Sequence, residues 1–446
     1  MRHWFIEKLA GYGDLPAIAF ANRIYSYSEL VEEVESVSRY LVEHSIAKGE
    51  VVAITGDYSF QSVALFLALI QNSNIIVPIT SKVKEEIAER LVEGHCDRQI
   101  VVAEKYDLSQ LSVPPGHPYI ERLRAEERPG LILFSSGSTG KPKAMVLNLH
   151  RVTNAYRDNR GPSYVTLIFL MFDHIGGVNT LFHILSSGGF AVFTDNRAPD
   201  YVSSLVEQYK VELLPSSPTF LNLLLISESH QKYNMDSLKL ITYGTEAMPE
   251  SLLKRVKAVF PAIKLKQTFG TSETGILSTK SKSDDSLFMK LGGKGFEYKI
   301  VNDELFVKSD LAMLGYLNEA NPFTEDGWFP TGDLVEVDED GYLKIIGRSK
   351  EVINVGGEKV LPVEIESVLL EMEQIEDVMA YAEKNAITGQ NVSVDVVLKE
   401  GVDSRDIKKR IRMFCRERLD SYKIPASVTV VDKVNFGDRY KKIRRK

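Results

Sequence analysis

Residues 131–146 read LILFSSGSTGKPKAMV, and this stretch carries the strongest signal for fold and chemistry in the chain. An apolar strand runs into a loop of serine, threonine and glycine, which is followed by Lys141 and Lys143. Glycines let backbone N–H groups turn toward an anion, hydroxyls add donors, and lysines neutralise phosphate charge. The order G-x-x-x-x-G-K-[S/T] of a Walker loop is not satisfied. A loop of this composition is usually a flexible connector, but the strand before it and the lysines after it favour phosphate binding.

Strand-like and helix-like segments alternate on both sides of this loop. Ser28 precedes an amphipathic pattern that predicts a capped helix ending near Gly49. Short β-branched strands and apolar helices then follow one another as in βαβ units, which indicates a mostly parallel sheet covered by helices. The predicted strands are residues 51–55, 74–79, 130–134, 189–194 and 211–214, and the predicted helices are residues 59–71, 178–186 and 201–209.

The pattern changes in the last third of the chain. Residues 298–346 contain short strands separated by Gly, Asn and Asp turns, which is typical of an antiparallel β subdomain. After Arg348 follows a segment with helices predicted at 362–372 and 405–418, small enough to be a separate domain. We therefore expect an α/β fold with a large N-terminal domain of parallel or mixed sheets covered by helices, a short antiparallel β subdomain, and a small α+β C-terminal domain.

The composition is that of an ordinary globular protein, with 446 residues, 44% hydrophobic and 26% charged. This excludes a disordered, collagen-like or coiled-coil chain, and the length predicts two to four folded units. The apolar runs at 63–70 and 167–172 are far shorter than the roughly 20 residues that span a bilayer. The N-terminal stretch lacks a continuous apolar region, and Cys96 and Cys415 suggest no disulfide framework. We therefore expect a reduced, cytoplasmic protein.

The net charge of -7 is unevenly distributed. Residues 403–446 contain 15 basic and 6 acidic side chains, a local charge of +9, so the preceding 402 residues carry -16. Such a basic segment could bind nucleic acid or a phosphate-rich ligand. A solvated helix face followed by a frayed terminus explains the same charge, so the charge alone decides nothing.

The loop SSGSTGKPK resembles the phosphate loop of the adenylate-forming superfamily, which includes acyl- and aryl-CoA synthetases, nonribosomal-peptide adenylation domains and firefly-type luciferases. Four further stretches match motifs of that superfamily in the right order. They are FGTSE at 269–273, WFPTGD at 328–333, GRSK at 347–350 and INVGGEKVLPVEIE at 353–366. Five ordered matches exclude a chance likeness, and the pattern is closest to that of acyl- or aryl-acid:thiol ligases.

The resemblance implies a site for the phosphates of ATP and for Mg²⁺. Thr271 would donate its hydroxyl to the α-phosphate, and Glu273 would bind the metal, because a hard cation prefers carboxylate and phosphate oxygens. The residues implied to hold the β- and γ-phosphates are Ser135, Ser136, Gly137, Ser138, Thr139, Gly140 and Lys143.

The resemblance also implies a nucleoside site. Phe269, followed by Gly270, would stack on adenine. Asp333 would accept both ribose hydroxyls, and Arg348 would donate to the same sugar. The residues implied to line the purine are Gly244, Thr245 and Glu246.

Residues 172–177, FDHIGG, align without gaps with the superfamily's aromatic-H-x-x-G segment, which makes His174 the aromatic wall of the acyl pocket. Members that activate amino acids usually carry an aspartate just after this wall. Ile175 stands there and Asp173 lies on the wrong side, so an unaminated carboxylic acid is the expected substrate. The pocket candidates, none of which identifies the acid, are His174, Asn179, Tyr243, Thr245, Gln267, Thr268 and Gly275.

The superfamily's near-terminal catalytic lysine lies in an ending of the form P-x-x-x-x-G-K-[I/V]-x-R. The matching stretch at 441–445 is KKIRR, which makes Lys442 the preferred candidate, although a slip of one residue would select Lys441. The upstream proline is missing. The residues predicted to act in catalysis are Lys442, Thr271, Glu273 and His174.

In the superfamily a small C-terminal domain rotates about a hinge between two half-reactions. Lys350 matches the hinge, so the expected domains are residues 1–348 and a mobile lid of residues 349–446. Gly356 and Gly357 would then reach the active site and leave room for a pantetheine arm.

The expected function is ATP-dependent activation of a carboxylic acid to an acyl-adenylate, with pyrophosphate release and transfer to the thiol of coenzyme A. A stand-alone adenylation enzyme that loads a carrier-protein phosphopantetheine is the alternative. A non-catalytic adenylate-binding protein is a further alternative. The expected cofactors are ATP and Mg²⁺, with no nucleic-acid partner, and the sequence predicts no oligomeric state.

Overall fold

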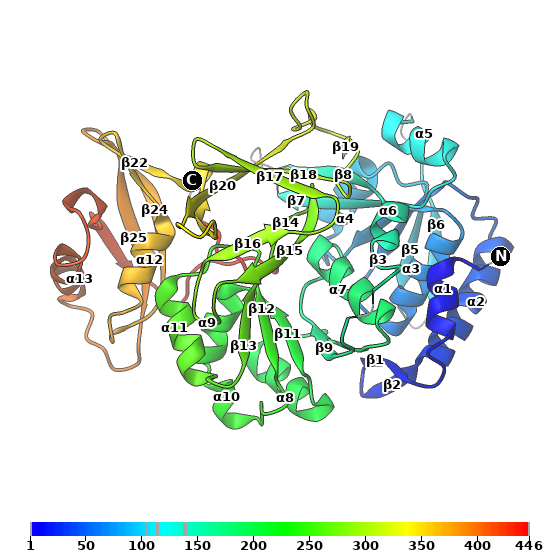
Figure 1. The fold of residues 1–446 in the computed structure, drawn as a ribbon, viewed down its shortest axis with the longest axis horizontal. Helices are drawn as coiled ribbons and strands as arrows, with labels where there is room; N and C mark the ends of the chain where they lie inside the picture. Colours follow the sequence, from blue (N-terminus) through cyan, green and yellow to red (C-terminus); the bar gives the residue numbers. More distant parts are fainter. Residues whose placement is uncertain (1, 104, 113–115, 137–140, 160, 445–446) are drawn as a thin grey trace.

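The computed structural model describes residues 2–103, 105–112, 116–136, 141–159 and 161–444. In this part of the chain the strands form four sheets, three of seven strands and one of five (Figure 1). The N-terminus lies at one end of the long axis and helix α13 at the other (Figure 1). No helix among the described residues has both the length and the apolar character needed to cross a membrane.

The first sheet carries the strand that leads into the predicted phosphate loop. Its central strands are parallel and lie between antiparallel edges, so the sheet is mixed. In spatial order its strands are β19 (Gly315–Tyr316), β8 (Pro142–Asn148), β7 (Gly130–Ser136), β4 (Ile75–Ile79), β3 (Val51–Thr55), β5 (Arg98–Val102) and β6 (Tyr106–Gln110).

The second sheet forms the floor of the site described below. All its strand pairs are parallel except β1 with β2, and it is therefore also mixed. In spatial order its strands are β13 (Lys264–Gln267), β12 (Leu240–Tyr243), β11 (Leu213–Ser216), β9 (Val165–Ile168), β10 (Phe190–Phe193), β1 (Pro16–Phe20) and β2 (Arg23–Ser26).

Helices fill the space around these two sheets. Ten of the twelve residues of α3 are buried, which is what a helix apolar on all sides requires. One apolar cluster joins α1, α2, α3 and α7 to both sheets. The helices of this part are α1 (Trp4–Ala10), α2 (Tyr27–Glu43), α3 (Phe60–Gln71), α4 (Lys84–Glu93), α5 (Pro118–Ala125), α6 (Leu149–Asn154), α7 (Ile175–Ser186), α8 (Pro199–Tyr209), α9 (Pro218–Ile226), α10 (Ser229–Lys232) and α11 (Glu250–Val259).

The third sheet is antiparallel, as the pattern of residues 298–346 predicts. It begins directly after β13 and carries three of the five superfamily-like motifs. In spatial order its strands are β14 (Phe269–Thr271), β15 (Gly275–Ser281), β16 (Met289–Gly292), β21 (Leu343–Arg348), β20 (Phe329–Val337), β18 (Glu304–Ser309) and β17 (Phe296–Val301).

A short 3-10 turn, η1 (Ser349–Glu351), connects β21 to the fourth sheet. The apolar cluster of this smaller C-terminal part continues into the second sheet, and α12 contacts α11. Its elements are β22 (Ile353–Val355), β23 (Glu358–Val360), α12 (Pro362–Leu369), β24 (Ile375–Asn385), β25 (Gly389–Leu398), α13 (Ile407–Arg416), η2 (Ser421–Lys423) and β26 (Ser427–Val430). The expected α/β fold, with a large N-terminal part and a small C-terminal one, is confirmed.

Candidate active site

Two cavities meet at the carboxyl ends of β11, β12 and β13. The first, of about 1200 Å³, lies between these ends, β21 and the C-terminal segment, and we call it the hinge-side cavity. The second, of about 1160 Å³, lies between helix α7 and the second sheet, and we call it the α7 cavity. The residues that line both are Ser135, Gly244, Thr245, Thr268, Phe269, Gly270, Arg348, Lys350, Arg439 and Lys441.

Most of the predicted site residues border these cavities, and a few do not. Glu246, Gln267, Asp333 and Lys442 line the hinge-side cavity. Lys143, His174, Asn179, Thr271 and Glu273 line the α7 cavity. Tyr243, Gly275, Gly356 and Gly357 line neither cavity.

The predicted phosphate loop is described only at its two ends. Ser135 lines both cavities, and the backbone of Ser136 ends strand β7. The Lys143 ammonium lies 3.2 Å from a carboxylate oxygen of Glu319. Gly137, Ser138, Thr139 and Gly140 lie outside the described residues.

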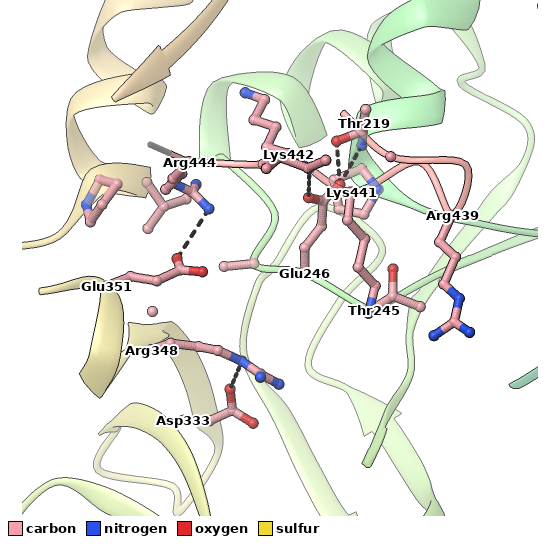
Figure 2. Close-up of a pocket in the computed structure, with 18 of the residues that line it drawn as sticks. Thr219, Thr245, Glu246, Asp333, Arg348, Glu351, Arg439, Lys441, Lys442 and Arg444 are labelled. Atoms are coloured by element: carbon pink, nitrogen blue, oxygen red, sulfur yellow. Dashed lines mark hydrogen bonds and ion pairs between the residues drawn. The ribbon is translucent and has the colours of Figure 1, made fainter. Parts of the chain in front are cut away.

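Asp333 and Arg348 face each other across adjacent strands β20 and β21. Asp333 is 5% exposed, and the Arg348 Nε donates to its Oδ1 over 3.0 Å (Figure 2). Burial raises the pKa of Asp333, and the Arg348 guanidinium opposes the increase. The second carboxylate oxygen remains available to hydroxyl donors of a ligand in the hinge-side cavity.

Thr271 ends β14, and Glu273 lies on the turn between β14 and β15. The Thr271 hydroxyl is within 2.9 Å of the Thr274 hydroxyl, and Tyr316 donates its hydroxyl to Glu273 Oε1 over 2.7 Å. Burial raises the pKa of Tyr316, and the Glu273 carboxylate adds to this effect, so the phenol stays a donor. The described residues contain no cluster of three metal-ligating side chains. A single carboxylate fits a Mg²⁺ ion whose other ligands are phosphate oxygens and water.

The two consecutive lysines near the C-terminus point in opposite directions (Figure 2). Phe436 and Lys442 form a β-bridge, so neighbouring side chains along this segment alternate between faces. The Lys441 side chain extends into the junction of the cavities, near Thr245 (Figure 2). The Lys442 ammonium instead lies in the C-terminal part, where it donates to the Val378 carbonyl over 2.6 Å.

The electrostatic surroundings of the two lysines also differ. Burial lowers the pKa of Lys441 to about 8, and the Arg348 guanidinium contributes to the decrease. No described carboxylate lies within ion-pair distance of the Lys441 ammonium. Lys442 lies 3.5 Å from Glu366 and 3.6 Å from Asp377. Burial opposes the charged form of Lys442, but these two carboxylates outweigh it and raise its pKa.

Glu246 holds the C-terminal segment against the large N-terminal part. Its Oε1 accepts from the Thr219 backbone N–H over 2.8 Å and from the Thr219 hydroxyl over 2.5 Å. Its Oε2 accepts from the Lys442 backbone N–H over 3.3 Å (Figure 2). Burial raises the pKa of Glu246, and the Thr219 hydroxyl opposes the increase. Glu246 therefore has a structural contact that sequence reasoning missed.

Arg439 forms a second contact between the C-terminal segment and the large part. Its Nη2 lies 3.2 Å from Asp173 Oδ2, and the same oxygen is 3.2 Å from Arg90 on α4. Arg439 also donates to the Phe134 carbonyl at the end of β7. Asp173 is 2% exposed, so its charge is compensated by the two arginines. No spacing in the sequence links these three residues, and only burial and geometry identify them.

His174 caps α7 and lines the α7 cavity. Its Nδ1 accepts from the Gly176 backbone N–H over 2.9 Å. Burial lowers the pKa of His174 well below its usual range, and Lys441 and Arg439 act in the same direction. The imidazole is therefore neutral, as suits the wall of an acyl pocket.

Two family models match most of this chain, and relatives of similar length are known. A model described as AMP-binding enzyme matches residues 5–317, and one described as AMP-binding enzyme C-terminal domain matches residues 364–435. A 2-succinylbenzoate–CoA ligase of Listeria innocua is 25% identical over 97% of this chain and 96% of its own length. An indoleacetate–CoA ligase of Aromatoleum aromaticum is 26% identical over 94% and 91%. The crystal structure of an anthranilate CoA ligase with anthranoyl-AMP, 19% identical, shares the fold with a TM-score of 0.84 over 99% of this chain and 96% of that one.

Proposed function

Because the chain belongs to the AMP-binding enzyme family, we propose that it activates a carboxylic acid with ATP and transfers the acyl group to coenzyme A. The observation that carries the proposal is the junction of the two cavities, where Lys441 lies between the Asp333–Arg348 pair and the N-terminus of α7. The relatives named above are CoA ligases of aryl acids, which supports an acyl or aryl acid as substrate and CoA as acceptor. They do not favour transfer to a carrier protein.

The nucleoside of ATP would occupy the hinge-side cavity. Asp333 accepts the ribose hydroxyls and Arg348 donates to the sugar. Phe269, at the start of β14, stacks on the adenine. A Cβ on Gly244 would lie 2.5 Å from the Thr268 hydroxyl, so a glycine is needed where this loop crosses the floor of the site. The neighbouring Thr245 backbone has a φ of 73°, which fixes the loop that faces the purine.

The first half-reaction takes place where the cavities join. A carboxylate oxygen of the acid in the α7 cavity attacks the α-phosphorus, the bond to the bridging oxygen breaks, and pyrophosphate leaves. Negative charge develops on the transferred phosphoryl group, so preorganised donors lower the barrier. Thr271 would donate its hydroxyl to this group. Mg²⁺ held by Glu273 would neutralise phosphate charge.

We propose Lys441 as the lysine of this step, and Lys442 as a structural residue. Lys441 is half-buried at the junction of the cavities and has no ion-pair partner among the described residues, so its charge is free for the carboxylate and phosphate. In this register Arg444 takes the arginine position of the K-[I/V]-x-R ending. The Arg444 guanidinium lies 3.1 Å from Glu366, while Lys442 stands where the pattern has Ile or Val.

The second half-reaction would follow rotation of the lid. Lys350 lies in η1, between the last strand of the third sheet and the first strand of the fourth, which supports a boundary between residues 1–348 and 349–446. Gly356 and Gly357 form the turn between β22 and β23, with φ of 62° and 98°. A rotated lid would bring this turn to the adenylate, where the thiol attacks the acyl carbon and AMP leaves.

The test is acid-dependent ATP–pyrophosphate exchange over a panel of aryl and alkyl carboxylic acids, followed by product analysis with CoA. We expect exchange with a subset of the acids, and equal amounts of acyl-CoA and AMP once CoA is added. Exchange without acyl-CoA would support a carrier-loading enzyme. Binding of ATP with no exchange across the panel would support a non-catalytic protein.

A further inference from the structure

The end of the α7 cavity that lies away from the junction, which we call the deep end, carries a positive charge. Lys266 on β13 pairs with Thr242 on β12, which pairs with Pro215 on β11, and all three line the cavity. Two residues further along their strands, Gly244 and Thr268 lie at the junction with the hinge-side cavity. A strand rises about 3.3 Å per residue, so Lys266 begins roughly 7 Å deeper than the junction.

Helix α7, on the opposite wall of the cavity, also runs from the junction toward the deep end. Its N-cap His174 is close enough to Lys441 and Arg439 for both charges to lower its pKa. His183 lies nine residues further along, about 13 Å at the rise of an α-helix, and also lines the cavity. Burial lowers the pKa of His183, and the charge of Lys266 adds to the decrease. Lys266 and His183 therefore face each other far from the reacting carboxyl.

The Lys266 ammonium has no acidic partner in the described part of the chain, although most of its side chain is covered. Three carboxylates line the same cavity, and each has a hydrogen-bond or ion-pair partner other than Lys266. Glu273 accepts from Tyr316, Glu319 pairs with Lys143, and Glu304 accepts from the Gly332 backbone N–H. The deep end therefore has a cation and no compensating anion of its own.

A third polar group at this wall is also oriented as a donor. Tyr156 donates its hydroxyl to Asn179 Oδ1, which leaves the Asn179 amide N–H groups for the cavity. The amide, the neutral imidazole of His183 and the Lys266 ammonium together offer donors. A partly buried set of donors with an unpaired cation is complementary to an anionic acceptor.

We propose that the substrate carries a second acidic group, roughly 10 Å from the carboxyl that is activated, and that Lys266 binds it with help from His183 and Asn179. This inference rests on the proposed function and specifies its substrate class as a diacid. The apolar lining between the two ends, from Leu170, Ile175 and Ile276, would hold the aryl or alkyl spacer.

The experiment compares diacids with monoacids that lack only the distal carboxylate, using ATP–pyrophosphate exchange. The pairs are 2-succinylbenzoate with 4-oxo-4-phenylbutanoate, suberate with octanoate, and sebacate with decanoate. For at least one pair we expect kcat/KM to favour the diacid by about 10- to 100-fold, the range for a hydrogen bond to a charged group. Lys266→Met should abolish this preference through the KM of the diacid, and Lys266→Arg should restore most of it.

Lys264→Met is the matched control, because Lys264 lies on the same strand and carries the same charge but is exposed and outside both cavities. It should keep the diacid preference. Equal kcat/KM within every pair, or equal losses for both acids in Lys266→Met, would overturn the diacid inference while the proposed function stands. Exchange with none of these or other carboxylic acids would overturn the proposed function and the inference with it.

Discussion

Single residues at the junction of the cavities can be tested through the pair Lys441 and Lys442. Lys441→Ala should lower adenylate formation by about 10²- to 10³-fold, the usual effect of losing one preorganised donor. Thioester formation from supplied acyl-adenylate should persist, because the lysine acts only in the first step. Pyrophosphate release and acyl-CoA formation, measured separately, check the two steps.

Lys442→Ala should act on stability rather than on the chemistry. It leaves the Glu366 and Asp377 carboxylates, 2% and 4% exposed, without one cation, at a cost of about 3 kcal/mol. A thermal melt should show the loss, while the folded fraction keeps its exchange activity. A folded Lys442→Ala protein without exchange, next to a normal Lys441→Ala, would restore Lys442 as the catalytic residue.

The pKa of Lys441, lowered by burial to about 8, predicts a pH dependence for the first step. The charged form is the useful one, and its fraction decreases as the pH rises through about 8. The kcat/KM for exchange should therefore decrease above that pH. Lys441→Arg should remove this alkaline limb, because a guanidinium remains charged. An unchanged limb in that variant would assign the titration to another group.

The sequence motifs pointed to many of the residues that line the two cavities, but not to every one and not to every orientation. Lys441 and Lys442 are equivalent in composition, and only the bridge between Phe436 and Lys442 determines which side chain faces the ligands. Lys266 belongs to no motif. Its position in the cavity follows from the strand register, and its charge matters because no acidic side chain pairs with it. Both depend on residues far away in the sequence, so no local pattern predicts them.

Among the structural elements, the hinge turn η1 gives the clearest prediction. Lys350→Pro would fix φ near −65° in the segment that must change conformation when the lid rotates. We expect the adenylation step to persist and acyl transfer to CoA to fail. Lys350→Ala, which keeps the backbone free, is the control and should carry out both steps. Equal loss of both steps in the proline variant would place the pivot elsewhere.

The boundaries of helices and strands were predicted well where apolar periodicity is strong. They were predicted less well where a capping residue sets the end of a helix. The predicted helix after Ser28 begins earlier, at Tyr27, and ends earlier, at Glu43, because Ser26 and Glu29 form the capping box. Helix α7 begins at Ile175 rather than at residue 178, because His174 provides the cap. Strand β3 and the start of α12 agree with the pattern, since buried strands and Pro at the first turn are local signals.

On the scale of the whole molecule, part of the charge of the basic C-terminal segment is compensated inside the fold. Arg439 pairs with Asp173, Lys442 with Glu366 and Asp377, and Arg444 with Glu351 and Glu366. The sequence shows only the excess of charge, because the acidic partners lie up to 266 residues away. These three cations are therefore compensated inside the fold, whereas Lys408, Lys409 and Arg416 on α13 are exposed.

The choice of CoA as acceptor predicts weak salt dependence of the thioester reaction. CoA engages few charges and does so at close range, so the thioester rate with CoA should change by less than about threefold between low and high ionic strength. The rate with a holo carrier protein, measured in parallel, should be lower. A carrier protein that reacts faster than CoA, with a steep decrease as salt is added, would contradict the choice of acceptor.

The contacts of the C-terminal segment have a consequence for the direction of catalysis. Arg439, which binds Asp173, and Lys441, which extends into the cavities, are separated by one residue. The segment therefore cannot separate from Asp173 without withdrawing the Lys441 ammonium from the cavities. In the proposed mechanism, resynthesis of ATP from acyl-adenylate and pyrophosphate would require the same ammonium as the forward step. Undocking of the segment would therefore admit the thiol and, in the same movement, prevent the return to ATP.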